Sequence, residues 1–217
     1  MNHVGAGGLC MMRAVDPPGS ATGSQEYAER LIGLQTAAWK RWVGAQTLFR
    51  WNLLRLEPGF TLDVGCGIGR NLLHLGRQGV GVDTNEHCVR TARARGLTAF
   101  TPDEFFRTTE YNTPQRFDTI LLSHVAEHMT EDQVVGLLQL YEPLLRKDGR
   151  AILIAPQEAG FRSDPTHVEL MDFDRLSRIS RRVGFEVERS FSFPFPRWVG
   201  RVFTYNEFVV VSRKPPA

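Results

Sequence analysis

Three glycines on alternate positions, Gly65, Gly67 and Gly69, follow directly after a short apolar run that ends at Val64. Glycine is required where the backbone adopts a positive φ or lies close against a ligand. The next segment, residues 71–77, carries leucines at helical spacing. The pattern therefore predicts a strand, a tight turn that can hold a nucleotide-like ligand, and a helix.

The residues around this turn narrow the choice of ligand. A dinucleotide-binding fingerprint needs its third glycine one place later, and that position is Arg70. A pyrophosphate, and with it a nicotinamide-dependent oxidoreductase, is therefore disfavoured. Asp63 stands two places ahead of Gly65. A carboxylate there suits a ligand that carries an ammonium group, such as the amino-acid end of S-adenosylmethionine.

The segment from Asp63 to Gly69 resembles the first motif of class I S-adenosylmethionine-dependent methyltransferases. A second short apolar run ends on Asp83, 18 residues after Gly65, where that family has an acid that pairs with two ribose hydroxyls. RFDTILLSHVAEHM resembles the fourth-strand motif, and LLRKDGRAILIAPQ resembles the following turn and fifth strand. The resemblance spans residues 58–214 and implies S-adenosylmethionine as the cofactor.

Strand and helix patterns alternate after Pro58, which predicts parallel strands with right-handed crossovers. The predicted strands are 60–64, 79–83, 98–101, 119–123 and 151–155, and the predicted helices are 71–77, 86–95, 103–107, 131–146 and 172–183. Two β-rich runs, 185–193 and 207–212, have no helix of ordinary length between them. We expect an α/β, Rossmann-like, doubly wound seven-stranded sheet, mostly parallel with an antiparallel closing strand, plus N-terminal helices.

The 217 residues, 42% of them hydrophobic, predict one domain overall. Residues 1–24 are rich in Gly, Ala, Pro and Ser and are expected to be a flexible leader. Residues 25–57 carry apolar side chains at helical spacing and are expected to form an N-terminal helical segment. Residues 58–217 then form the domain that binds S-adenosylmethionine.

The charges nearly balance, with 26 basic against 24 acidic residues, so no overall field attracts nucleic acid. Cys10, Cys66 and Cys88 have no metal-like spacing, which suits a reducing cytoplasm. No stretch has the apolar core of a secretion signal or the length of a membrane span. A soluble cytoplasmic protein is expected, and its oligomeric state is not indicated.

Ligands of an open, doubly wound sheet bind at the carboxyl ends of the strands, so cofactor residues are expected just after each apolar run. Asp83 is alternatively a helix cap, and the same holds for Asp103, which the resemblance puts near the adenine amine. The expected residues are Asp63, Gly65, Cys66, Gly67 and Gly69 for the methionine portion, Asp83 and Thr84 for the ribose, Asp103 for the adenine, and the backbone of Ser123 beneath the sulfonium.

The sequence HVAEH places His124, Glu127 and His128 on one face if a helix begins there, and His167 lies in a segment expected at the same rim. The pattern resembles the divalent-metal site of small-RNA 2′-O-methyltransferases and, in part, of ubiquinone-pathway O-methyltransferases. The resemblance implies a metal held by these four residues, although it has a carboxylate where this chain has His124. Imidazole and carboxylate ligands suit Zn, Mn, Fe, Co or Ni better than Mg.

Two other roles stay open for these residues. His124 or His167, with Glu127, can accept the proton of an acceptor hydroxyl, or all of them can be structural. The chain lacks the Asn-Pro-Pro-aromatic motif that amino-group methyltransferases often place after the fourth strand. An oxygen atom of a small molecule, glycan or lipid-linked acceptor is therefore favoured.

The segment Phe191 to Tyr205 concentrates six aromatic residues with Arg197 and Arg201. It can pack under the N-terminal helices, line an acceptor pocket for a small or lipid-like molecule, or make a peripheral membrane contact. The predicted function is methyl transfer from S-adenosylmethionine to such an acceptor. The alternatives are an RNA methyltransferase with a metal-assisted His/Glu site and a catalytically silent partner subunit of the same fold.

Overall fold

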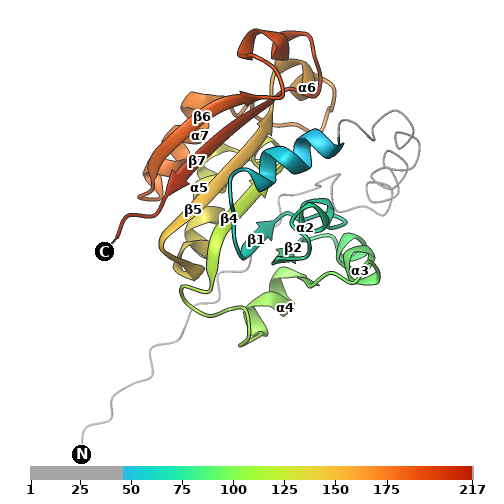
Figure 1. Ribbon diagram of the computed structural model, residues 1–217, viewed down its shortest axis with the longest axis vertical. Coiled ribbons are helices and arrows are strands. Elements are labelled where there is room, and N and C mark those ends of the chain that lie inside the picture. Colours follow the sequence, from blue (N-terminus) through green and yellow to red (C-terminus); the bar gives the residue numbers. More distant parts are fainter. Residues whose placement is uncertain (1–45, 217) are drawn as a thin grey trace, which may run out of the picture.

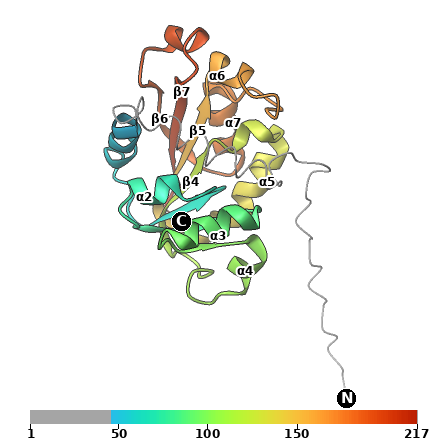
Figure 2. The same cartoon turned by 90° about the vertical axis from the view of Figure 1, so that its right-hand side faces the viewer.

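The computed structural model describes residues 46–216, which form a seven-stranded sheet with helices on both faces (Figures 1 and 2). The strand order is β3-β2-β1-β4-β5-β7-β6. The strands are β1 Thr61–Val64, β2 Gly79–Val82, β3 Ala99–Phe100, β4 Phe117–Ser123, β5 Leu145–Pro156, β6 Glu186–Phe193 and β7 Glu207–Arg213. The first five strands pair in parallel, and β7 runs antiparallel to both neighbours. The predicted fold class is confirmed.

The helices cover the sheet from its two sides (Figure 2). They are residues 46–54, α2 Arg70–His74, α3 Glu86–Ala94, α4 Pro102–Arg107, α5 Glu131–Tyr141, α6 Glu158–Arg162 and α7 Phe173–Arg182, with 3-10 helices η2 Ala126–His128, η3 Glu142–Leu144 and η4 Arg197–Arg201. None of the described helices is long and apolar enough to cross a membrane.

Two of the three hydrophobic clusters of the described residues lie on opposite faces of the central strands, because side chains alternate along a strand. Ile120 and Leu122 of β4 point into the core that contains α5 and α7. Leu121 points to the other face, where it packs with Leu53 of the 46–54 helix and with Leu75. Burying both faces of the central strands explains their nearly continuous apolar sequence.

The structure corrects several predicted boundaries, among them that of the predicted helix 71–77, which is α2 Arg70–His74. The predicted helix 131–146 ends at Tyr141, because Pro143, the second residue of the 3-10 helix η3, has no N–H to continue the α-helical hydrogen bonds. The predicted strand 151–155 is the buried part of β5, which already begins at Leu145. The predicted leader 1–24, most of the predicted helical segment 25–57 and Cys10 lie outside the described residues.

Candidate functional site

The glycine turn joins β1 to α2 in left-handed backbone geometry. Gly65, Gly67 and Gly69 have φ values of 76°, 53° and 81°. A side chain at Gly65 would place its Cβ 2.3 Å from a methyl of Val125, and one at Gly69 would lie 2.2 Å from a methyl of Leu97. Both the dihedral angles and the close packing therefore require glycine, as the sequence predicted.

Asp63 is fully buried at the end of β1, immediately before the turn. Its Oδ1 accepts a long 3.4 Å hydrogen bond from Asn71, and Oδ2 has no partner in the described part of the chain. Burial raises the pKa of this carboxyl to about 7, although the Asn71 hydrogen bond opposes the shift. An unpaired buried oxygen of this kind fits the ammonium group of a methionine moiety.

Asp83 ties the end of β2 to the glycine turn. Its Oδ2 accepts a 2.7 Å hydrogen bond from the backbone N–H of Gly67, and its Oδ1 accepts one of 2.8 Å from Asn85. The N-cap of α3 is Asn85, not Asp83, so the alternative cap role for Asp83 is wrong. Burial raises the pKa of Asp83. Each of its oxygens has a further lone pair that can accept a hydrogen bond from a ribose hydroxyl.

Three other predicted cofactor residues differ in their burial. Cys66 is buried with its thiol against Gly81, so it offers backbone atoms rather than its side chain. Thr84 is exposed in the turn beside Asp83. Ser123 is half-buried at the end of β4, where it pairs with Ile154 of β5.

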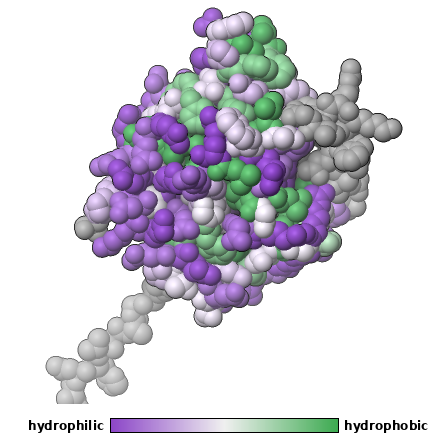
Figure 3. All heavy atoms as spheres, in the orientation of Figure 1, coloured by the Kyte–Doolittle hydropathy of each residue, from purple (hydrophilic) through white to green (hydrophobic). Residues whose placement is uncertain are grey.

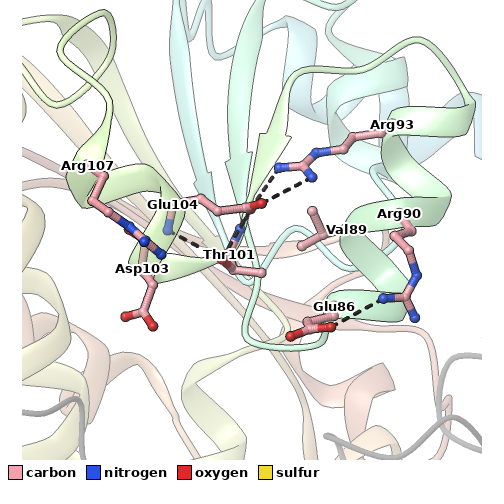
Figure 4. A pocket seen from close by; sticks show the side chains of 8 residues that line it. All are labelled: Glu86, Val89, Arg90, Arg93, Thr101, Asp103, Glu104 and Arg107. Atoms are coloured by element: carbon pink, nitrogen blue, oxygen red, sulfur yellow. Dashed lines mark hydrogen bonds and ion pairs between the residues drawn. The ribbon is translucent and has the colours of Figure 1, made fainter.

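Asp103 is an exposed residue in the first turn of α4, whose N-cap is Thr101 with a capping box from Glu104. The cap alternative is therefore wrong for Asp103 as well. A pocket beside it is lined by Glu86, Val89, Arg90, Arg93, Thr101, Asp103, Glu104 and Arg107. Figure 4 shows Arg90 paired with Glu86 and Arg93 paired with Glu104, while Asp103 points away. The lining is largely charged, and Val89 is its apolar side chain.

His124 follows β4 in left-handed geometry, with φ 59° and its N–H bonded to the carbonyl of Ile154. Its Nε2 lies 2.8 Å from Glu207, and its Nδ1 lies 3.2 Å from Glu127. Burial lowers the pKa of this ring, but the hydrogen bonds and charges of Glu127 and Glu207 outweigh it and raise the pKa to about 9. The ring is therefore protonated at neutral pH.

No helix begins at His124, so the condition under which HVAEH would share one helical face is not met. Only Ala126–His128 form a 3-10 helix, and His124 lies outside it. Three residues could hold a metal ion together, because one ligand atom from each lies within 4.8 Å of the others: Glu127, His128 and His167. His124 is not part of this group. The structure thus brings three of the four predicted metal residues together. The predicted convergence of His167 on this rim is correct.

Glu207 is the partner that the sequence analysis missed. It opens β7, opposite Pro156 of β5, and it is 7% exposed. The signal in the sequence was an acid at the head of an otherwise apolar last strand, EFVVVS. The pairing of that acid with His124 depends on the position of β7 in the sheet.

The aromatic segment 191–205 divides into two parts. Phe193 is buried and packs its ring against Phe49 and Trp51. Trp198 and Tyr205 are 68% and 46% exposed around η4. Apolar side chains gather at this end of the molecule in the space-filling view (Figure 3). Packing against the 46–54 helix is therefore confirmed for the first part only.

Comparison with known proteins gives concordant results. The family described as a methyltransferase domain matches residues 40–190. Among curated proteins, no sequence matches the chain significantly.

Solved structures of methyltransferases share the fold at low sequence identity. A S-adenosylmethionine-dependent methyltransferase from Archaeoglobus fulgidus has a TM-score of 0.60 and 19% identity, covering 85% of this chain and 99% of its own. A chain of the complex between the Haloferax volcanii Trm112 methyltransferase activator and a methyltransferase has a TM-score of 0.67 and 18% identity, covering 92% and 99%. Magnesium protoporphyrin IX methyltransferase from Synechocystis with bound S-adenosylmethionine has a TM-score of 0.55 and 14% identity, covering 88% and 86%. The chain therefore belongs to the family described as a methyltransferase domain.

Proposed function

We propose that the chain transfers the methyl group of S-adenosylmethionine to a hydroxyl oxygen of a small-molecule, glycan or lipid-linked acceptor. One observation carries this proposal: the glycine turn lies against the start of a polar cluster. Val125 packs on Gly65, and Glu127 and His128 follow within three residues. A methyl donor in the turn and a hydroxyl at the cluster are thus neighbours.

The cofactor end of the site is formed by the ends of β1 and β2. Asp63 would receive the ammonium group and Asp83 the ribose hydroxyls, while Gly65, Gly67 and Gly69 let the backbone approach the methionine portion. When bound, the cofactor supplies an electrophilic methyl group on a sulfonium.

The remaining cofactor residues have supporting roles in this proposal. Thr84 would lie beside the ribose and Asp103 near the adenine amine, and the backbone of Ser123 would pass beneath the sulfonium. Transfer from a sulfonium is an in-line displacement, so the protein mainly aligns and desolvates the acceptor.

The acceptor hydroxyl must lose its proton as the new C–O bond forms. His124 is protonated at neutral pH, so we assign it to holding Glu127 rather than to accepting this proton. The Nδ1 of His167 lies 2.8 Å from the carbonyl oxygen of Phe161, so Nδ1 is the protonated nitrogen and Nε2 keeps the lone pair in the neutral ring. His167 and Glu127 therefore provide the lone pairs that face the acceptor.

The aromatic surface around η4 supports an apolar or lipid-like acceptor. Trp198, Phe195 and Tyr205 are exposed there, next to Arg201. Aromatic faces beside an arginine suit an apolar body that carries an anionic group, or contact with a membrane surface. Gly160 of α6 lies against the backbone of Thr204, and Phe161 contacts His167, so this surface connects directly to the polar cluster.

Calorimetric titration with S-adenosylmethionine tests the cofactor site. We expect micromolar binding to the wild type and at least about 100-fold weaker binding to Asp83→Ala, which loses both the ribose contact and the Gly67 hydrogen bond. The matched control is Asp132→Ala, which removes an exposed carboxylate of α5 that does not line the pocket beside Asp103.

Labelled cofactor and a panel of acceptors then test the methylated atom. Transfer to hydroxyls supports the proposal. Equal cofactor binding by Asp83→Ala would contradict the cofactor site, and methylation of amines alone would contradict the assignment of oxygen.

A further inference from the structure

Arg55 is held among aromatic rings at the end of the 46–54 helix. Its guanidinium carbon lies 4.6 Å from the ring centre of Trp51 and 4.8 Å from that of Phe191. Its Nε donates a 3.0 Å hydrogen bond to the side chain of the buried Asn52. These contacts fix the direction of the guanidinium. Its two Nη groups have no hydrogen-bond partner among residues 46–216, so they can donate to a ligand.

Arg189 adds a second positive charge on the same surface. It lies on β6 two residues before Phe191, and alternate residues of a strand point to the same face. Burial and the charge of Arg189 lower the pKa of Arg55, and neither arginine forms an ion pair within the described part of the chain. Glu188, the acid next to Arg189, pairs with Arg213 at 3.1 Å. Two neighbouring guanidiniums without a counterion repel each other, so a bound anion would stabilise them.

The surface beside the two arginines is apolar. Leu48 and Trp51 are 47% and 53% exposed. They share one side of the helix with Arg55, whose N–H donates to the carbonyl of Trp51 and so continues the helical spacing. Figure 1 shows this helix, in blue, lying across the sheet on the side opposite to α7. An exposed indole and a leucine beside arginines are typical of surfaces that bind anionic lipids.

From these observations we propose that Arg55 and Arg189 bind the phosphate group of an anionic phospholipid, while Trp51 and Leu48 contact its apolar part. A guanidinium can donate two parallel hydrogen bonds to a phosphate. Nucleic acid carries phosphates too, but its bases stack on aromatic rings, and an exposed leucine offers no such ring. The apolar side chains therefore favour a lipid as the ligand.

This lipid site is separate from the residues assigned to methyl transfer. None of its four side chains belongs to the glycine turn or to the polar cluster around Glu127. Binding of the lipid therefore does not depend on the proposed function. A protein held at a lipid surface would meet a lipid-linked acceptor there, and only this consequence rests on the proposed function.

Sedimentation with lipid vesicles tests the site without any methyl transfer. The full chain is mixed with vesicles of phosphatidylglycerol and, separately, of phosphatidylcholine. We expect binding to phosphatidylglycerol that weakens as the salt concentration rises, and at least about tenfold weaker binding to phosphatidylcholine, which has no net charge. Arg55→Gln and Arg189→Gln should each weaken binding about fivefold, the contribution of one arginine near an anionic surface.

Arg181→Gln is the matched control, because it removes the same charge from an exposed arginine of α7 on the other face of the sheet. Its affinity for the vesicles should stay within about twofold of the wild type. Calorimetry then compares the short-chain monomer dihexanoylphosphatidylglycerol with inorganic phosphate. Inorganic phosphate lacks the apolar part, so it should bind at least about tenfold more weakly.

Equal vesicle binding by all three arginine variants would overturn the site, and so would equal binding of the two lipids by the wild type. Inorganic phosphate that binds as tightly as the short-chain lipid would overturn the assignment to a lipid. Binding of S-adenosylmethionine by every variant shows that the fold is intact. Failure of the wild type to bind S-adenosylmethionine would instead overturn the proposed function and leave the lipid site standing.

Discussion

At the scale of single residues, Asp63 shows how a charged group can be prepared for a ligand. Burial raises its pKa to about 7, and the negative charge of Asp83 adds to the shift while Asn71 and Arg70 oppose it. Its Oδ2 is buried and has no hydrogen-bond partner in the described residues. The free protein therefore holds this carboxyl partly protonated at neutral pH, and an arriving ammonium group favours the ionised form.

This linkage predicts that affinity for S-adenosylmethionine decreases as the pH is lowered below about 7. Below the pKa of Asp63, binding must release a proton, so the affinity should fall by up to about tenfold per pH unit. About one pH unit above that pKa of about 7 the carboxyl is almost fully ionised, and this dependence ends. Calorimetry between pH 5.5 and pH 8.5, on either side of the Asp63 pKa of about 7, measures this pH dependence of the affinity.

Two controls separate Asp63 from the other carboxylates of the site. Methylthioadenosine keeps the ribose but lacks the ammonium group, so it should retain only the contribution of Asp83. The Asp63→Asn variant should bind S-adenosylmethionine more weakly, with a flatter pH profile. A profile that is equally steep for both ligands would contradict the assignment of the ammonium site to Asp63.

At the scale of secondary-structure elements, the glycine turn depends on close packing as well as on φ. Gly69 and Gly76 have similar positive φ values of 81° and 63°, but only a side chain at Gly69 would meet another atom, at 2.2 Å from Leu97. Left-handed geometry costs an alanine about 1–2 kcal/mol at either position. Overpacking should add about 1–3 kcal/mol at Gly69 alone.

We therefore expect Gly69→Ala to lower the free energy of unfolding by about 2–5 kcal/mol and Gly76→Ala by about 1–2 kcal/mol. Urea denaturation of the two variants measures the difference. Gly76→Ala should also keep its affinity for the cofactor, whereas Gly69→Ala should not. Equal losses of stability would show that Leu97 moves aside and that packing does not restrict this position.

Most elements of the fold were predictable from local sequence, since strand and helix patterns alternate with glycine turns between them. The errors lie where one residue changes local geometry. Pro143 ends α5 early, and the left-handed φ of His124 keeps that residue out of η2. Positive φ in a residue other than glycine leaves only a weak bias toward Asn, Asp and His in a single sequence, which does not suffice to predict the geometry of His124.

The part of the site that follows from the sheet topology could be predicted from the sequence. Parallel strands end at one edge of the sheet, and this brought the segment after β4 and His167 to the same rim. The contact between His124 and Glu207 joins residues 83 positions apart. It requires β7 to lie between β5 and β6, and the alternating pattern of the sequence does not specify that order.

At the scale of the whole molecule, the insertion of β7 connects the C-terminal strands to the acceptor side of the site. Glu207 at the head of β7 holds His124, and His124 lies against Glu127. The ring is 34% exposed, so the two carboxylates rather than burial decide its pKa of about 9. One imidazolium thus links β7 to the segment that follows β4.

This link predicts a pH dependence of the free energy of unfolding. The folded pKa of about 9 lies above the unfolded value near 6.5. The stabilisation by His124 is therefore fully present below about pH 6.5 and is lost as the pH rises through about 9. Urea denaturation of the wild type and of His124→Gln at a series of pH values isolates this contribution, because all other groups contribute to both proteins.

The difference in free energy of unfolding between the wild type and His124→Gln should become smaller as the pH rises. The same difference should also be smaller when both proteins carry Glu207→Gln. A difference that stays constant from pH 6 to pH 9.5, on either side of that pKa of about 9, would show that His124 contributes only packing. In that case the segment after β4 would be held by the backbone bond from His124 to Ile154. The ion pairs of His124 would then have no part in stabilising the fold, and its proposed hold on Glu127 would lose its physical basis.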